Sequence, residues 1–275
     1  MDEKQAQLGW EERTGRLAAF ACLASAALIV AAFAYRIGVL PRGANNAKEF
    51  LPQVEAHNGA FLVAGILTGL GMLAFIAPLL YLYKVTRFRR PEIPSVARVL
   101  VIFGPILFAI CSVWLVFRQG HAADQFAAGT VKTNKHAEDL LRAATTAVAA
   151  LSLAAGIATG LGTILLSMHA MRAGLLSRFM GILGVILGVL FVLPLIASPI
   201  IQLFWMLALG ALFLNFWPSG RGPAWETGEA TPWPTAQGPL RAAAEDHEPD
   251  DEPEPVPAPA SPGASRKRRK KKARR

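Results

Sequence analysis

The sequence predicts an all-α fold: a polytopic membrane bundle of six transmembrane helices, followed by a disordered C-terminal tail. The chain of 275 residues is 53% hydrophobic and has a mean hydropathy of +0.38, a composition typical of a multi-pass membrane protein. Six apolar segments approach the length of about 20 residues that a bilayer core requires. The alternating pattern of a transmembrane β-barrel is absent.

Helices are expected for these segments because each must satisfy its own backbone hydrogen bonds in lipid. The first apolar stretch, 17–35, follows sixteen residues with four acids and exceeds the roughly 7–15 residues of a signal-peptide core, so we expect an uncleaved span. Between the last two spans we expect a tight hairpin at Ser198 and Pro199 rather than one kinked helix. The predicted spans are 17–40, 59–83, 99–117, 143–171, 179–197 and 200–217.

The basic turn 84–98, KVTRFRRPEIPSVAR, predicts the orientation because Lys and Arg are retained on the cytoplasmic side of a membrane. With the N-terminus inside, twelve Lys or Arg residues before the final basic cluster are cytoplasmic and seven are exterior. We therefore expect a plasma-membrane protein with both termini in the cytoplasm. The predicted organisation is a cytoplasmic N-terminus (1–16), a transmembrane domain (17–217) and a cytoplasmic tail (218–275).

An internal repeat connects spans two and four. Residues 62–71, LVAGILTGLG, match 153–162, LAAGIATGLG, at eight of ten positions. This similarity predicts a parallel repeat of two helical hairpins, spans 2–3 and 4–5, although membrane composition alone could also produce it. Glycines four residues apart let helices approach closely. They are expected to pack helices within the bundle or, alternatively, to form a homodimer or a contact with another membrane protein: Gly65, Gly69, Gly156, Gly160, Gly184 and Gly188.

Residues that could carry chemistry are few. The sequence contains no HExxH, no Walker-type glycine loop and no GxSxG in a strand–helix setting, so we predict a non-enzyme with no cofactor and identify no small-molecule substrate. One metal hypothesis involves His57, His121, His136 and Asp124, which share the predicted exterior side. Their spacing is not that of a metal motif, and ordinary solvated loop residues are the alternative.

The tail carries an acidic stretch and then RKRRKKKARR at 266–275. Its Pro-rich composition without apolar periodicity predicts disorder. Basic clusters bind anionic inner-leaflet lipid at about 1 kcal/mol per residue. A dedicated partner, or none, is the alternative, and nucleic acid is disfavoured. The residues expected to contact lipid or anions are Arg87, Arg89, Arg90, Arg266, Lys267, Arg268, Arg269 and Lys270.

The six spans, the Gly-rich second span and the arginine-rich turn resemble uncharacterised six-span membrane proteins of high-GC bacteria. That resemblance covers residues 16–217 and implies no activity. The sequence therefore predicts a non-catalytic accessory or scaffold protein with a lipid- or partner-binding tail. The alternative is a channel or carrier for a neutral or lipid-like solute, which would need a polar or roomy cavity between the hairpins.

Overall fold

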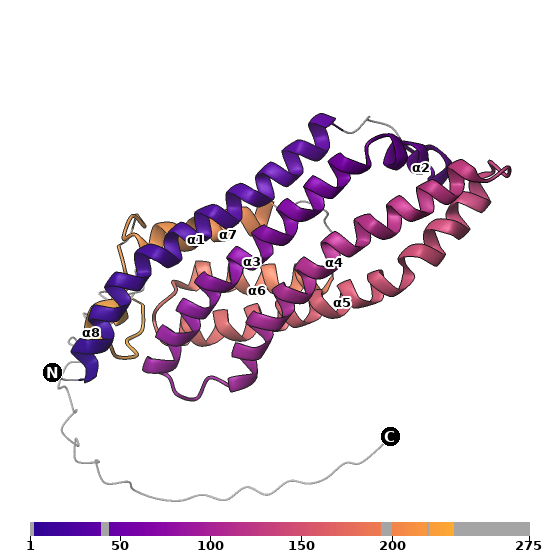
Figure 1. The fold of residues 1–275 in the computed structure, drawn as a ribbon. Coiled ribbons are helices and arrows are strands. Elements are labelled where there is room, and N and C mark those ends of the chain that lie inside the picture. The colour runs from indigo at the N-terminus through magenta and orange to yellow at the C-terminus, as the bar shows by residue number, and fades with distance from the viewer. Residues whose placement is uncertain (1–2, 40–43, 194–199, 219, 234–275) are drawn as a thin grey trace, which may run out of the picture. The chain divides into compact units, whose positions relative to one another are not determined.

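The structure, a computed structural model, describes residues 3–39, 44–193, 200–218 and 220–233, all within the first of two compact units. In these ranges all regular secondary structure is helical, which confirms the all-α prediction (Figure 1). The helices are α1 (Glu3–Val39), α2 (Ala47–Ala56), α3 (Asn58–Arg89), α4 (Ser95–Ala128), α5 (Asn134–Arg172), α6 (Arg178–Val192), α7 (Ile200–Phe213) and α8 (Ala224–Thr227).

Four helices, α1, α3, α4 and α5, are long and apolar enough to cross a membrane. The helices that correspond to the last two predicted spans are shorter: α6 has 15 residues and α7 has 14. At 1.5 Å per residue each is about 22 Å long, less than the roughly 30 Å of a hydrocarbon core. The predicted hairpin at Ser198 and Pro199 lies outside the described residues.

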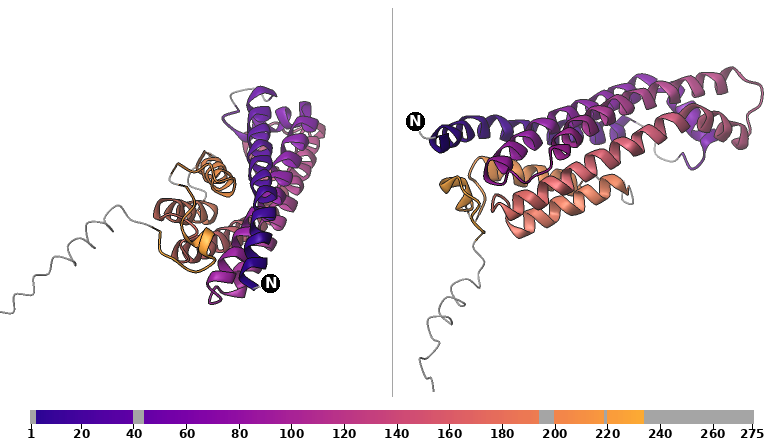
Figure 2. Two further views of the ribbon diagram at one scale, coloured as in Figure 1. Left: turned by 90° about the vertical axis from the view of Figure 1, so that its left-hand side faces the viewer. Right: turned by 90° about the horizontal axis from the view of Figure 1, so that it is seen from below.

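The helices α1, α3, α4, α5, α6 and α7 form a ring in which each packs against the next and the last packs against the first. Each of α3, α4, α5 and α6 packs against its neighbour in that series, α7 packs against α6, and both α3 and α7 pack against α1. The closure lies toward the end that holds α8, which we call the proximal end; the end that holds α2 is the distal end (Figure 2). Large side chains fill the closed part and are fully buried: Phe75, Leu79, Leu166, Met206 and Trp205.

The helices extend beyond the predicted spans at both ends. At the proximal end α1 begins at Glu3 and α3 continues to Arg89, so the predicted turn 84–98 shrinks to 90–94. At the distal end α4 continues to Ala128, through a stretch predicted as a loop. The reason is packing: Phe126 of α4 is buried in one apolar cluster with Leu51 and Val54 of α2. Burying such side chains stabilises helical turns that would not form alone.

Residues that cap the helix starts explain several of the observed boundaries. Asn46 precedes α2, and its side chain accepts a hydrogen bond from the backbone N–H of Glu49 at 3.0 Å. Thr133 caps α5 through the N–H of His136. Ser177 caps α6 in the same way. Each cap satisfies an N–H group that a helix start leaves without a partner.

The glycines of the two hairpins lie at helix contacts. A methyl group at Gly65 would lie 3.1 Å from the carbonyl oxygen of Ser112 in α4, and one at Gly156 would lie 2.5 Å from that of Phe191 in α6. Gly69 faces Ala109, and Gly160 faces the backbone of Gly188, while Gly184 faces the side chain of Ser167. In each hairpin, therefore, the glycine pair of the first helix lies against the backbone of the second.

Candidate functional site

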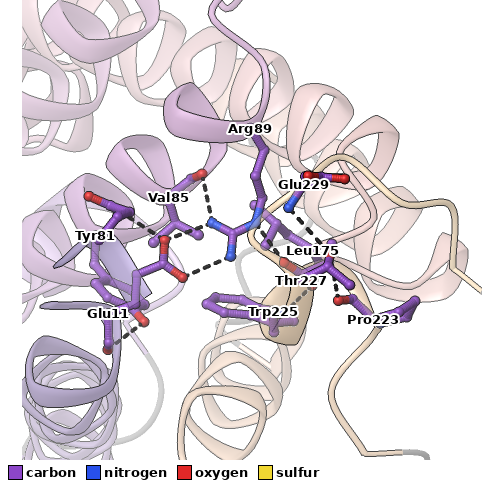
Figure 3. Close-up of polar contacts among 11 residues, drawn as sticks. Glu11, Tyr81, Val85, Arg89, Leu175, Pro223, Trp225, Thr227 and Glu229 are labelled. Atoms are coloured by element: carbon purple, nitrogen blue, oxygen red, sulfur yellow. Dashed lines mark hydrogen bonds and ion pairs between the residues drawn. The ribbon is translucent and has the colours of Figure 1, made fainter. Parts of the chain in front are cut away.

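The main polar cluster lies at the proximal end, where segments far apart in the sequence meet (Figure 3). We call it the proximal cap and define it as Glu11 of α1, Tyr81 and Arg89 of α3, and Arg221 and Trp225 of the segment after α7. The two extra turns at the end of α3 carry Arg89 to the level of Glu11. The segment 220–233 then folds back over both helices.

A buried ion pair forms the centre of the cap. Arg89 Nη1 and Nη2 donate to the two carboxylate oxygens of Glu11 at 2.7 and 2.9 Å. The side chain of Arg89 is 0% exposed and that of Glu11 is 5% exposed. Two parallel hydrogen bonds to one carboxylate fix the geometry of the pair, and burial protects them from screening by salt.

The remaining donors of Arg89 connect the pair to the segment after α7. Arg89 Nε donates to the carbonyl oxygen of Ala224 at 2.8 Å, and Nη1 also donates to that of Val85. Tyr81 donates through its hydroxyl group to the backbone carbonyl of Glu11 at 3.0 Å. Thus α1, α3 and α8 are joined through one guanidinium group and one phenol.

Trp225 anchors α8 to the bundle. Its indole is 5% exposed, stacks on the ring of Tyr81 with centroids 6.2 Å apart, and donates to the carbonyl oxygen of Leu175 at 3.0 Å. Such a side chain combines a large buried apolar area with a satisfied donor. Trp225 thus belongs to the core, although it stands after Pro218, in the stretch predicted as the beginning of the tail.

Contacts on either side of Trp225 hold the same segment. Arg221 donates to the carbonyl oxygens of Leu212 and Phe213 at the end of α7. Its guanidinium carbon lies 5.3 Å from the centroid of the Trp225 ring. Beyond α8, Lys4 of α1 pairs with Glu229 at 2.7 Å. The segment is thus tied to α7, α3 and the start of α1.

We expect the Lys4–Glu229 contact to depend on pH. The hydrogen bond from Lys4, and then its positive charge, hold the pKa of the Glu229 carboxyl below its usual value, which is about 4.3 in an unfolded chain. A lowered pKa means that the contact contributes fully above that value and is lost as the pH falls through the lowered pKa. Titration of the Glu229 carboxyl carbon by NMR should show this, and Lys4→Met should raise the pKa; an unchanged titration in that variant would contradict the contact.

The contacts of the cap are structural: they hold three parts of the chain together. The hydrogen-bonding groups of its charged side chains are directed at one another and at backbone carbonyls, and the described cap presents no activated nucleophile. Breaking such a pair by removing one member is costly because it leaves the other charge buried. The arrangement therefore fixes the position of residues 220–233 against the bundle.

The residues predicted to contact lipid or anions have different surroundings. Arg89 is a correction: it is buried and paired with Glu11, because the extended α3 turns it inward. Arg87 is exposed and donates to the Tyr83 hydroxyl, and Arg90 pairs with Glu92 at 2.6 Å. The predicted contacts in the tail, 266–270, lie outside the described residues.

The residues of the metal hypothesis do not converge. Within the described ranges, no three His, Cys, Asp or Glu side chains gather closely enough to hold a metal ion. The His57 ring contacts the carbonyl oxygen of Gln53, and the His121 ring contacts the side chain of Gln125. The ring of His136 lies beside Phe126. The four residues of that hypothesis thus do not form a site.

Sequence reasoning missed the two central residues of the cap. Glu11 is one of four acids before the first span, and nothing in its neighbourhood distinguishes it from the exposed Glu12. Trp225 stands in a Gly- and Pro-rich stretch that is typical of a linker. The signal that could have been used is the presence of Trp217, Trp225 and Trp233, since large aromatic residues are uncommon in disordered segments.

Comparisons of the chain with protein-family models, with curated proteins and with solved structures found no match.

Proposed function

We propose that this chain is a multi-pass protein of the cell membrane that acts as a non-catalytic accessory or scaffold protein. In this proposal the bundle spans the membrane six times, and the proximal cap holds the root of a cytoplasmic tail at the inner leaflet. The tail binds anionic lipid or a partner through its basic cluster. The observation that carries the proposal is the cap itself, which joins α1, α3 and α8 through buried contacts.

The proposed orientation places the proximal end in the cytoplasm. Support comes from the charges: this end carries the basic residues of the 84–98 stretch, and the last described segment, 220–233, packs there. Because Lys and Arg are retained on the cytoplasmic side, the excess of these residues at the proximal end favours a cytoplasmic location for it, even though Arg89 is paired.

The proposed count of six spans rests on the similarity of the two hairpins. Gly65 and Gly69 face the backbone of α4, and Gly156 and Gly160 face the backbone of α6. Thr68 and Thr159, at the same place in the repeated sequence, each donate to the carbonyl four residues earlier. This similarity supports a duplicated hairpin, in which α6 runs in the same direction as α4.

A scaffold is favoured over the alternative of a channel or carrier. A carrier needs a path between the hairpins, and the proximal half of the bundle is occupied by buried side chains. Phe75 and Trp205 are both 0% exposed and pack edge to face with centroids 6.1 Å apart. Leu79 and Leu166 are also fully buried. This packing closes the proximal half to a continuous path through the bundle, which supports a scaffold over a carrier.

The experiment compares three forms of the full-length protein in nanodiscs of neutral lipid. The first is unchanged, the second ends after Trp233, and the third has the nine basic residues of 266–275 replaced by Gln. Cutting after Trp233 rather than before Pro218 keeps the proximal cap intact. We expect only the unchanged protein to capture phosphatidylglycerol vesicles, and capture to fall steeply with salt.

Capture of phosphatidylcholine vesicles serves as the control and should be negligible. Equal capture of anionic vesicles by all three forms would contradict the lipid-binding role of the tail. If vesicle capture is absent but the tail retains a protein from detergent-solubilised membranes, and the Gln variant loses it, the basic cluster binds a partner instead. If replacing the basic cluster by Gln reduces neither vesicle capture nor partner retention, the tail has no binding role and the scaffold proposal is overturned.

A further inference from the structure

A cavity of about 320 Å³ lies in the distal half of the bundle, between α3 and α4 and bordered by α1 and α5. One end is polar and holds Arg36 of α1 and Gln119 of α4. The other end is mainly apolar, with Phe108 and Leu115 of α4 in its lining. The hydroxyl groups of Thr68 and Ser112 at this end donate to backbone carbonyls. Its two ends therefore differ in chemistry as the two ends of an amphiphile do.

The cavity follows from the short helices. The described part of α6 ends at Val192, with Phe191 against Gly156, which is in the middle of α5. The Phe191 ring contacts Phe108 at 6.5 Å and Phe75 at the same centroid distance. These rings form the boundary between the filled proximal half of the bundle and the cavity in the distal half. Beyond them, the long helices α1, α3, α4 and α5 continue toward the distal end, and the cavity lies among them.

The polar end of the cavity is positively charged. Arg36 lies on α1 among exposed apolar side chains, and among the described residues it forms neither a hydrogen bond nor an ion pair. In the described structure the side chain of Gln119 likewise has no hydrogen-bond partner. An arginine at membrane depth normally has an anionic or carbonyl partner. Here an arginine and an amide line the same end of the cavity, and such donors suit a phosphate or carboxylate group.

We propose that this cavity binds one acyl chain of an anionic lipid, with the headgroup phosphate held by Arg36 and Gln119. The chain lies along α3 and α4 toward Phe108. The volume admits about ten groups the size of a water molecule, at about 30 Å³ each, so it fits a single chain and not a whole two-chain lipid. The second chain remains in the surrounding bilayer. This site is at the opposite end from the proximal cap and is independent of the tail.

The test measures lipids bound to the full-length protein by native mass spectrometry after titration with phosphatidylglycerol. Arg36→Gln should weaken binding at least tenfold, the smallest factor expected when a charge-assisted hydrogen bond is lost. Arg36→Lys should retain most of the affinity, because it keeps the positive charge. Leu115→Trp should also abolish binding, since it fills the cavity but leaves Arg36 in place. Lys135→Gln is the matched control: it removes one positive charge from an exposed residue at the same end, outside the cavity.

Three further arms identify the ligand. Phosphatidylcholine should bind much more weakly, and inorganic phosphate should not displace the bound lipid. A fatty acid should compete only if its carboxylate satisfies Arg36 as well as a phosphate does. That result would change the headgroup class but keep the site. Equal weakening by Arg36→Gln and Lys135→Gln would mean that Arg36 only reaches the bilayer headgroups, and would overturn the proposal. Unchanged binding in both Arg36→Gln and Leu115→Trp would overturn it as well. Size-exclusion profiles verify that each variant is folded.

Discussion

Replacing Glu11 with Ala is expected to lower the free energy of unfolding by about 3–5 kcal/mol, the range measured when one member of a buried ion pair is removed. Arg89 would then lie buried without a counter-charge, and its Nη1 and Nη2 groups would lose both carboxylate oxygens. The change should appear as a lower melting temperature of the purified protein in detergent. Proteolysis within 220–233 should also become faster, because α8 is attached to Arg89 through Ala224.

Glu12→Ala is the matched control, since Glu12 is the neighbouring acid and is exposed. It should leave both the melting temperature and the proteolysis pattern unchanged. The double variant Glu11→Leu with Arg89→Met should recover much of the stability, because replacing both charges by apolar groups removes the buried unpaired charge. A Glu11→Ala protein as stable as the Glu12→Ala protein would contradict a buried pair.

Replacing Gly160 with Ala is expected to destabilise the α5–α6 hairpin by about 1–3 kcal/mol, as overpacking does. A methyl group there would collide with the backbone carbonyl of Gly188, which cannot move without separating the two helices. The sign is informative, because in an open part of a helix the same change stabilises by roughly 0.5–1 kcal/mol. The change in the free energy of unfolding can be measured by titrating the purified protein in mixed micelles with a denaturing detergent.

Gly59 supplies the matched control, because it lies in α3 with no atom near the place where a methyl group would be added. Gly59→Ala should be neutral or slightly stabilising. Gly69→Ala tests the corresponding contact in the first hairpin, where Ala109 O would lie 3.2 Å from the new methyl group; a smaller loss is expected. If Gly160→Ala behaved like Gly59→Ala, the close approach of α5 and α6 would be excluded.

The helical class and the approximate place of each helix could be predicted from the sequence, because apolar length and turn residues depend on local composition. Helix ends could not be predicted so well. Arg89 and Phe126 lie in helical turns beyond the predicted spans. Those turns are stabilised by partners distant in sequence, namely Glu11 for the first and α2 for the second. A charge count treats Arg89 as a surface cation, since it contains no information about which carboxylate lies nearby.

The candidate site was largely beyond sequence reasoning for the same reason. The proximal cap joins residues more than 200 positions apart, and Trp225 stands in a segment with linker composition. By contrast, the glycines singled out by spacing do lie at helix contacts, because close approach depends on small residues at fixed intervals. The role proposed for Arg36 could not be inferred from the sequence, since it depends on which side chains of α1, α3, α4 and α5 line the same cavity.

The most direct test of the proximal cap is a zero-length cross-link between Lys4 and Glu229 in native membranes. A carbodiimide joins an amine to a carboxylate only when they are in contact, and these two groups are 2.7 Å apart. Peptide mapping by mass spectrometry should find the Lys4–Glu229 amide in the unchanged protein and much less of it in the Glu11→Ala variant. If the cross-link is absent from the unchanged protein, or equally abundant in both, the segment 220–233 is not held by the cap and the account is contradicted.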